Sequence, residues 1–166
     1  MSVTKFKGAS VELFGEIPVI GSLAPNFRLI DSDLNEVQLS DYREHNLILN
    51  VFPSIDTPVC AMSVRKFNQN ADKMSNTKVL AISHDLPFAL KRYCAAEGLK
   101  NIIPLSAFRY RQFGQDYGLL MKSGPLKGLL ARAVIVINKE RKVIYTELVP
   151  DIGDEPNYDS ALDAVK

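Results

Sequence analysis

The sequence of 166 residues has no tryptophan, two histidines and two cysteines, and these scarcities exclude several kinds of site. His45 and His84 are isolated, and the C-x-x-C and H-x-x-x-H spacings are absent, so we expect no zinc site and no other metal centre. An excess of charge is lacking too. The net charge is +1 and the basic residues are scattered, which argues against a nucleic-acid partner.

Long apolar runs are also missing. None approaches the ~20 residues that cross a bilayer, and the N-terminal stretch lacks the apolar region of a secretory signal. We therefore expect no membrane partner and a cytoplasmic location, where a permanent disulfide between Cys60 and Cys94 is not expected. From composition alone the two cysteines could be buried structural thiols or a redox pair.

Apolar strands and helices alternate along the chain, whose length suits one domain over residues 1–166. Residues 47–52, 78–83 and 133–137 are almost entirely apolar, which predicts buried strands. The other expected elements are hairpins of 5–7 with 11–14 and 27–30 with 36–39, helices 58–73, 87–97, 109–116 and 158–166, and strands 101–105 and 142–148. This order predicts an α/β fold with a central mixed sheet, helices on both faces and an N-terminal β-hairpin.

The stretch FPSIDTPVC, residues 52–60, ends a buried strand and begins a helix. Asp56 or Thr57 can cap that helix, and Pro58 then takes its first position, where a missing N–H has no cost. Cys60 falls in the first turn, where unpaired N–H groups and the helix dipole favour a thiolate. The carboxyl end of a central strand is also where open α/β sheets place their chemistry. This geometry leaves two readings: an activated nucleophile, or an incidental cysteine in a core turn.

The same residues carry a resemblance to a known family. Pro53, Thr57 and Cys60 match the P-x-x-x-T-x-x-C signature of the peroxiredoxins. The strings FPSIDTPVCAMSVRKFN, SHDLPFALKRYCAAEG and GPLKGLLARAV resemble, in this order, the bacterial thiol peroxidases, which are atypical 2-Cys peroxiredoxins. The resemblance covers essentially the whole chain and implies a thioredoxin-like fold.

The resemblance also implies roles for individual residues. Cys60 resembles the peroxidatic cysteine, which attacks the O–O bond of a peroxide and becomes a sulfenic acid. Thr57 resembles the threonine that contacts the thiolate and the peroxide oxygen, and Pro53 the proline that shields the thiolate from water. Arg132 resembles the active-site arginine, although without the resemblance it could equally be a surface charge at a strand edge.

Cys94 resembles the resolving cysteine, which attacks the sulfenate and closes a Cys60–Cys94 disulfide. Because a disulfide needs Cα atoms within ~7 Å, we expect helix 87–97 to unwind locally during turnover. The resemblance implies a peroxidase that reduces hydrogen peroxide and organic hydroperoxides, with thioredoxin as its reductant, and a homodimer. No metal, haem or flavin cofactor is expected, because the cysteines carry the electrons.

Several nearby residues have weaker signals. Phe52, Ile55 and Val59 are expected to line an apolar entrance to the thiol, which favours alkyl or lipid hydroperoxides as substrates. Arg65 lies about 140° around the helix from Cys60, so we interpret it as a surface or dimer-contact charge. Met62 stands where the subfamily resemblance leads us to expect alanine or threonine.

Two functions of other classes remain open. One is a redox sensor or holdase that uses the same thiol to change shape without turnover. The other is a cysteine hydrolase that pairs Cys60 with a histidine such as His84. A hydrolase also needs an oxyanion hole and a group that orients the histidine, and no motif in the sequence supplies them.

Overall fold

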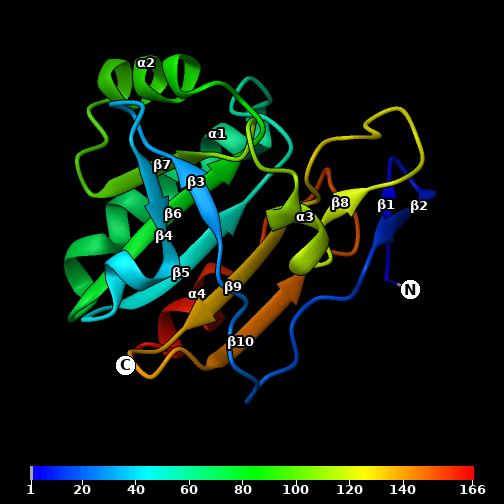
Figure 1. Cartoon of the computed structure of the whole chain (residues 1–166). Coiled ribbons are helices and arrows are strands. Elements are labelled where there is room, and N and C mark those ends of the chain that lie inside the picture. The colour runs from blue at the N-terminus through cyan, green and yellow to red at the C-terminus, as the bar shows by residue number, and fades with distance from the viewer. Residues whose placement is uncertain (1) are drawn as a thin grey trace.

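The computed structural model describes residues 2–166, and its centre is a seven-stranded mixed sheet in the order β10-β9-β5-β6-β7-β3-β4 (Figure 1). The strands are β3 (Arg28–Ile30), β4 (Glu36–Gln38), β5 (Asn46–Val51), β6 (Thr77–Ser83), β7 (Ile102–Ser106), β9 (Ala133–Ile137) and β10 (Val143–Leu148). Strands β5, β6 and β7 run parallel, and every other pair in the sheet is antiparallel. The expected thioredoxin-like α/β architecture is confirmed.

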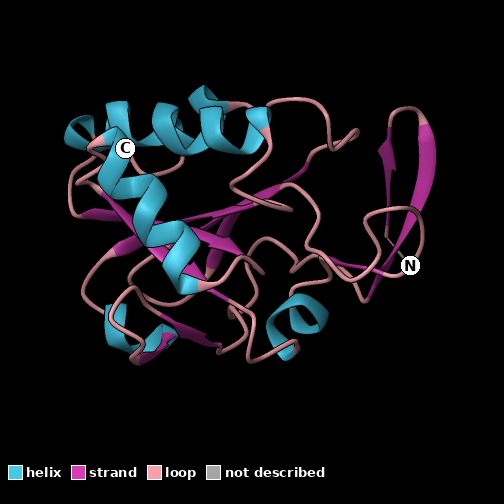
Figure 2. Ribbon diagram, turned by 90° about the horizontal axis from the view of Figure 1, so that it is seen from above, coloured by secondary structure: helices cyan, strands magenta, loops and turns pink. Residues whose placement is uncertain are grey.

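Helices cover both faces of this sheet, as predicted (Figure 2). On one face lie α1 (Pro58–Asn70), α2 (Pro87–Glu97) and α4 (Tyr158–Asp163), whose buried side chains share one hydrophobic cluster with the sheet. On the other face, α3 (Gln112–Asp116) and the 3₁₀ turn η1 (Leu39–Tyr42) contribute to a second cluster. The sheet is therefore buried on both sides, which explains why its central strands are almost entirely apolar.

The order of the parallel strands brings two connections together. Helix α1 joins β5 to β6, and α2 joins β6 to β7. Because β5 and β6 are neighbours in register, the segments that follow Val51 and Ser83 emerge at the same edge of the sheet. A backbone hydrogen bond of 3.1 Å, from the N–H of Phe52 to the carbonyl of Ile82, continues this pairing beyond β5.

A smaller sheet of three strands lies beside the main one (Figure 1). The predicted N-terminal hairpin is confirmed as β1 (Val3–Phe6) and β2 (Ala9–Phe14), and the third strand is β8 (Leu120–Met121), which the sequence did not predict. Main-chain hydrogen bonds join Lys5 to Pro150 and Ile152. The hairpin is thereby attached to the segment that follows β10.

The bounds of several elements differ from those predicted. Helix α2 and strand β9 have the predicted bounds. Helix α1 ends at Asn70 and continues as the 3₁₀ turn η2 (Ala71–Lys73), while the short helix predicted from residue 109 begins only at Gln112, and α4 ends at Asp163. Within residues 2–166, the helices are all too short or too polar to cross a membrane.

Candidate active site

The thiol lies at the junction of β5 and α1. Phe52 and Pro53 are buried after the strand, and Thr57 is the N-cap residue of α1 in an extended conformation, with Pro58 at the first helical position as predicted. The Thr57 hydroxyl does not cap the helix, however. It donates a hydrogen bond of 2.9 Å to the carbonyl of Ser54, so its side chain closes the turn at residues 54–57 and leaves the first-turn N–H groups uncapped.

A buried arginine contacts the thiol. Cys60 is 0% exposed and Arg132 is 2% exposed, so the alternative of a surface charge at position 132 is wrong. The Nη2 of Arg132 donates to the Cys60 Sγ at 3.1 Å, and its Nε donates to the Ile152 carbonyl at 2.8 Å. A guanidinium at this distance is placed to donate a charge-assisted hydrogen bond to a negatively charged sulfur.

The third nitrogen of the same guanidinium has a different environment. Among the described residues, the Nη1 of Arg132 is buried and has no hydrogen-bond partner. Leaving a charged donor unpaired inside a protein costs free energy, so such a group in a native structure needs a ligand or an ordered water. This donor is therefore available to an oxygen atom bound beside the sulfur.

A cavity of about 230 Å³ leads to Arg132. Pro53 and Thr57 form part of its wall, and most of the lining is apolar. The apolar side chains are Phe6 of the hairpin, Pro58 and Val59 of α1, Leu126 and Leu129 of the loop before β9, and Ile152. The prediction of an apolar entrance is right for Val59 and wrong for Phe52 and Ile55, because these two point into the core, where they are 0% and 3% exposed.

Cys94 has different surroundings. It lies half-buried in α2, and both cysteines are free thiols in this structure. Burial raises the pKa of Cys94 to about 11. In this conformation it is therefore a neutral thiol at pH 7, with little nucleophilic character.

The two cysteine-bearing helices are joined next to the cysteines themselves. The Tyr93 hydroxyl donates to the Ala61 carbonyl at 3.0 Å and accepts a hydrogen bond of 3.2 Å from the Nη1 of Arg65. Arg65 is half-buried and links α1 to α2, a contact that its interpretation as a surface or dimer-contact charge did not include. Ala61 directly follows Cys60, and Tyr93 directly precedes Cys94. The hydrogen bond between them therefore holds α2 close to the start of α1.

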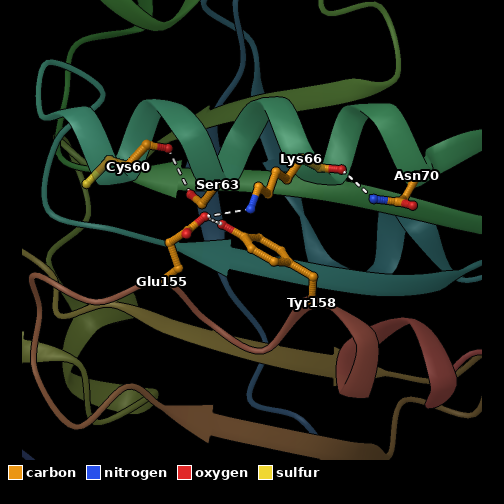
Figure 3. A network of polar contacts seen from close by, with 6 residues as sticks. All are labelled: Cys60, Ser63, Lys66, Asn70, Glu155 and Tyr158. Carbon is orange, nitrogen blue, oxygen red and sulfur yellow. Dashed lines mark hydrogen bonds and ion pairs between the residues drawn. The ribbon is translucent and has the colours of Figure 1, made fainter.

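A polar network lies under α1 (Figure 3). The Ser63 hydroxyl donates to the Cys60 carbonyl at 2.8 Å and accepts from the Asn50 amide at 3.1 Å. Farther along the helix, Lys66 pairs with Glu155 at 3.2 Å, and the Tyr158 hydroxyl donates to the same carboxylate at 2.9 Å. The segment between β10 and α4 is thus held against the helix that carries the thiol.

The structure also shows the surroundings of His84 and Met62, whose sequence signals were weaker. The His84 Nδ1 is 2.8 Å from the Gly128 carbonyl, and burial lowers the pKa of His84. Its ring therefore anchors the loop before β9. Met62 lies on the outer side of α1 and is 37% exposed.

Sequence reasoning missed two residues that support the site. Asn50 is the polar residue within the apolar run LILNVF, and Asp85 is the second residue after the buried strand KVLAIS. A polar residue inside a buried strand, or just beyond its carboxyl end, could have been recognised as a candidate on that ground alone.

Known proteins share this sequence and architecture. The redoxin family model matches residues 20–162. A thiol peroxidase of Corynebacterium glutamicum is 51% identical over 165 residues, which are 99% of both chains. Among solved structures, a peroxiredoxin-like protein from Aquifex aeolicus superimposes with a TM-score of 0.94 at 40% identity, covering 99% of this chain and 96% of that one. A thiol peroxidase from Chromobacterium violaceum gives a TM-score of 0.88 at 25% identity, covering 95% and 91%.

The match extends over nearly the whole chain, in sequence and in structure, and includes the strand–turn–helix unit that holds the buried thiol. The chain belongs to the redoxin family and is a peroxiredoxin of the thiol peroxidase group, an enzyme that reduces peroxides with a cysteine thiol.

Proposed function

We propose that Cys60 is the peroxidatic nucleophile of this enzyme and Cys94 its resolving cysteine. The observation that carries the proposal is the 3.1 Å contact between the buried Cys60 sulfur and the buried guanidinium of Arg132, which also lines an apolar cavity. The thiol is at the start of a helix, beside a fixed positive charge, and beside space for a ligand. These are the conditions under which a cysteine acts as a nucleophile.

The reaction has three balanced steps. The Cys60 thiolate attacks one peroxide oxygen, the O–O bond breaks, and the alkoxide leaves with a proton as an alcohol, or as water from hydrogen peroxide. Sulfur is thereby oxidised to sulfenic acid. The Cys94 thiol then attacks that sulfur, a disulfide forms and water leaves. An external dithiol finally supplies two electrons and two protons, which regenerate both thiols.

The surrounding residues stabilise the first step. The unpaired Nη1 of Arg132 donates to the peroxide oxygen on which negative charge develops. The Thr57 oxygen, whose proton is directed at Ser54, accepts the O–H of the peroxide. Pro53, buried in the cavity wall, keeps water from the sulfur.

The second step requires α2 to open. Cys60 is fully buried, and burial holds the pKa of Cys94 at about 11. Unwinding the last turns of α2, which end at Gly98 in the left-handed conformation, exposes Cys94 and returns its pKa towards the ordinary value of a thiol. The same motion that brings the two sulfurs together thus also activates Cys94.

The reductant in this proposal is thioredoxin, a small dithiol protein, and the enzyme acts as a homodimer in the cytoplasm, where dithiols are kept reduced. The test is NADPH consumption with thioredoxin, thioredoxin reductase and a hydroperoxide. Continuous turnover supports the proposal. A single stoichiometric oxidation, with no turnover, instead supports a redox sensor that uses the same thiol.

The variant Cys94→Ser is expected to keep the first turnover and lose the later ones. Cys60 still meets peroxide and forms sulfenic acid, but no partner thiol closes the disulfide that thioredoxin reduces. The sulfenic acid then accumulates and is oxidised further to sulfinic acid. Mass spectrometry after one and after several equivalents of peroxide checks this result. Undiminished NADPH turnover in this variant would rule out Cys94 as the resolving residue.

The apolar cavity predicts a preference for organic hydroperoxides over hydrogen peroxide in kcat/KM. Leu126→Ser should lower kcat/KM about ten-fold for an organic hydroperoxide and little for hydrogen peroxide, because one buried apolar contact in a pocket is worth ~10-fold or more. Leu34→Ser, at a residue 49% exposed outside the cavity, is the matched control. Equal losses for both peroxides would show that Leu126 does not select the substrate.

A further inference from the structure

Asp85 lies where the connections of two neighbouring strands meet. It follows β6 and precedes α2, the helix that carries Cys94, and it is half-buried. Strand β5 runs beside β6, and its continuation is the 54–57 turn that leads into α1. A single side chain at this point can therefore contact the segments that lead to both cysteines.

The carboxylate of Asp85 collects three donors. The Ser54 hydroxyl donates to Oδ1 at 2.8 Å, while the Ile55 N–H and the Ser83 hydroxyl donate to Oδ2 at 2.7 and 2.6 Å. The main chain of Asp85 is itself fixed, because the Ser106 hydroxyl donates to its carbonyl at 2.5 Å. Ser106 of β7 thus fixes the main chain of Asp85, and the Asp85 carboxylate in turn holds the 54–57 turn.

The turn passes this restraint on to the helix. The Ser54 carbonyl accepts hydrogen bonds from the Thr57 hydroxyl at 2.9 Å and from the Thr57 N–H at 3.2 Å. The Ser54 hydroxyl oxygen accepts from the Asp56 N–H at 3.1 Å. Thr57 is the N-cap residue of α1, three residues before Cys60. A continuous hydrogen-bonded chain therefore runs from Asp85 to the turn of the helix that contains the thiol.

We propose that Asp85 is a positioning residue that holds the 54–57 turn and the start of α1 in the conformation where Cys60 meets both Arg132 and peroxide. This inference rests on the proposed roles of Cys60 and Cys94. A carboxylate can only accept hydrogen bonds, and three donors converge on Asp85 here, so this one side chain joins the end of β6 to the 54–57 turn.

The same contacts act oppositely on the two chemical steps. Attack on peroxide takes place in the conformation that Asp85 stabilises, with Cys60 buried against Arg132. Disulfide formation requires Cys60 to leave that position, so the bonds from Asp85 to Ser54 and Ile55 oppose it. Asp85 therefore accelerates the oxidation of Cys60 and delays its capture by Cys94.

The test is Asp85→Asn, with the rate of peroxide attack and the rate of disulfide formation measured separately by rapid quenching, thiol blocking and mass spectrometry. The amide turns an NH₂ group towards donors, so we expect attack to slow by about ten-fold or more, since hydrogen bonds to charged groups contribute at this level. Disulfide formation should become faster, because the variant loses the contacts that hold Cys60 back. A general loss of structure would slow both steps, so the opposite responses identify positioning.

Two further variants keep the test decisive. Ser54→Ala removes one contact and leaves the carboxylate intact, so we expect a smaller change in the same direction, and it serves where Asp85→Asn does not fold. Asp116→Asn, at an exposed carboxylate that contacts Gln112 in its own helix, is the matched control. Attack rates equal to this control, or equal slowing of both steps, would overturn the proposal. Failure of the parent protein to oxidise Cys60 would instead overturn the proposed function.

Discussion

Replacing Cys60 with serine is expected to reduce hydroperoxide consumption to the uncatalysed background while leaving the protein folded. Serine differs from cysteine by one atom, and its hydroxyl can accept the hydrogen bond that the Arg132 Nη2 donates to sulfur. The free energy of unfolding should therefore change by only about 1 kcal/mol. A hydroxyl next to a guanidinium is still not a nucleophile towards peroxide, because it stays protonated at neutral pH and its oxygen lacks the polarisable lone pair of a sulfur thiolate.

The measurement is NADPH turnover together with single-turnover peroxide consumption, and thermal unfolding serves as the control for folding. The matched variant is Cys94→Ser, which loses turnover but keeps the single oxidation. Normal turnover in Cys60→Ser would assign the chemistry to another residue.

The second large effect is expected for Arg132→Met. Methionine fills a similar volume but donates nothing, so sulfur loses its positive neighbour and the peroxide oxygen loses the Nη1 donor. Removing one such donor from a site that binds a developing negative charge slows enzymes by about 10²–10³-fold, and we expect a decrease of this size in the rate of peroxide attack. The Ile152 carbonyl also loses its partner, which should lower the free energy of unfolding by about 1–3 kcal/mol.

Alkylation of Cys60 by iodoacetamide provides a second readout for Arg132→Met, since it follows the thiolate and involves no peroxide. The rate at pH 7 should fall together with the peroxidase rate. Arg28→Met, at an exposed arginine on β3, is the control and should change neither rate. An alkylation rate equal to that of the parent protein would contradict a role of Arg132 in holding the thiolate.

The main features of the fold could be predicted because they depend on local signals. Helix α2 has the predicted bounds, since Pro87 fits its first position and Gly98 takes the left-handed conformation after its end. Strand β9 was equally clear from five successive apolar residues. Strand β8 has only two residues, and its pairing with β2 bridges about 107 positions of sequence, so no local pattern could reveal it.

The candidate site residues could be named from the sequence, and their surroundings much less so. The motif supplied Cys60 and Thr57, but the direction of the Thr57 hydroxyl depends on the Ser54 carbonyl, which the turn brings within 2.9 Å. The cavity wall was predicted from residues adjacent to Cys60 in sequence, of which Phe52 and Ile55 instead enter the core. Its actual apolar side chains come from distant segments that only the tertiary structure brings together.

The most direct test of the account is the fate of the two thiols after the fully reduced protein receives one equivalent of hydroperoxide. Free thiols are alkylated, and the protein is digested and mapped by mass spectrometry. The account predicts that one peroxide is consumed per chain and that an intramolecular Cys60–Cys94 disulfide forms, with neither cysteine alkylated. Consumption of the peroxide while both thiols remain open to alkylation would contradict it.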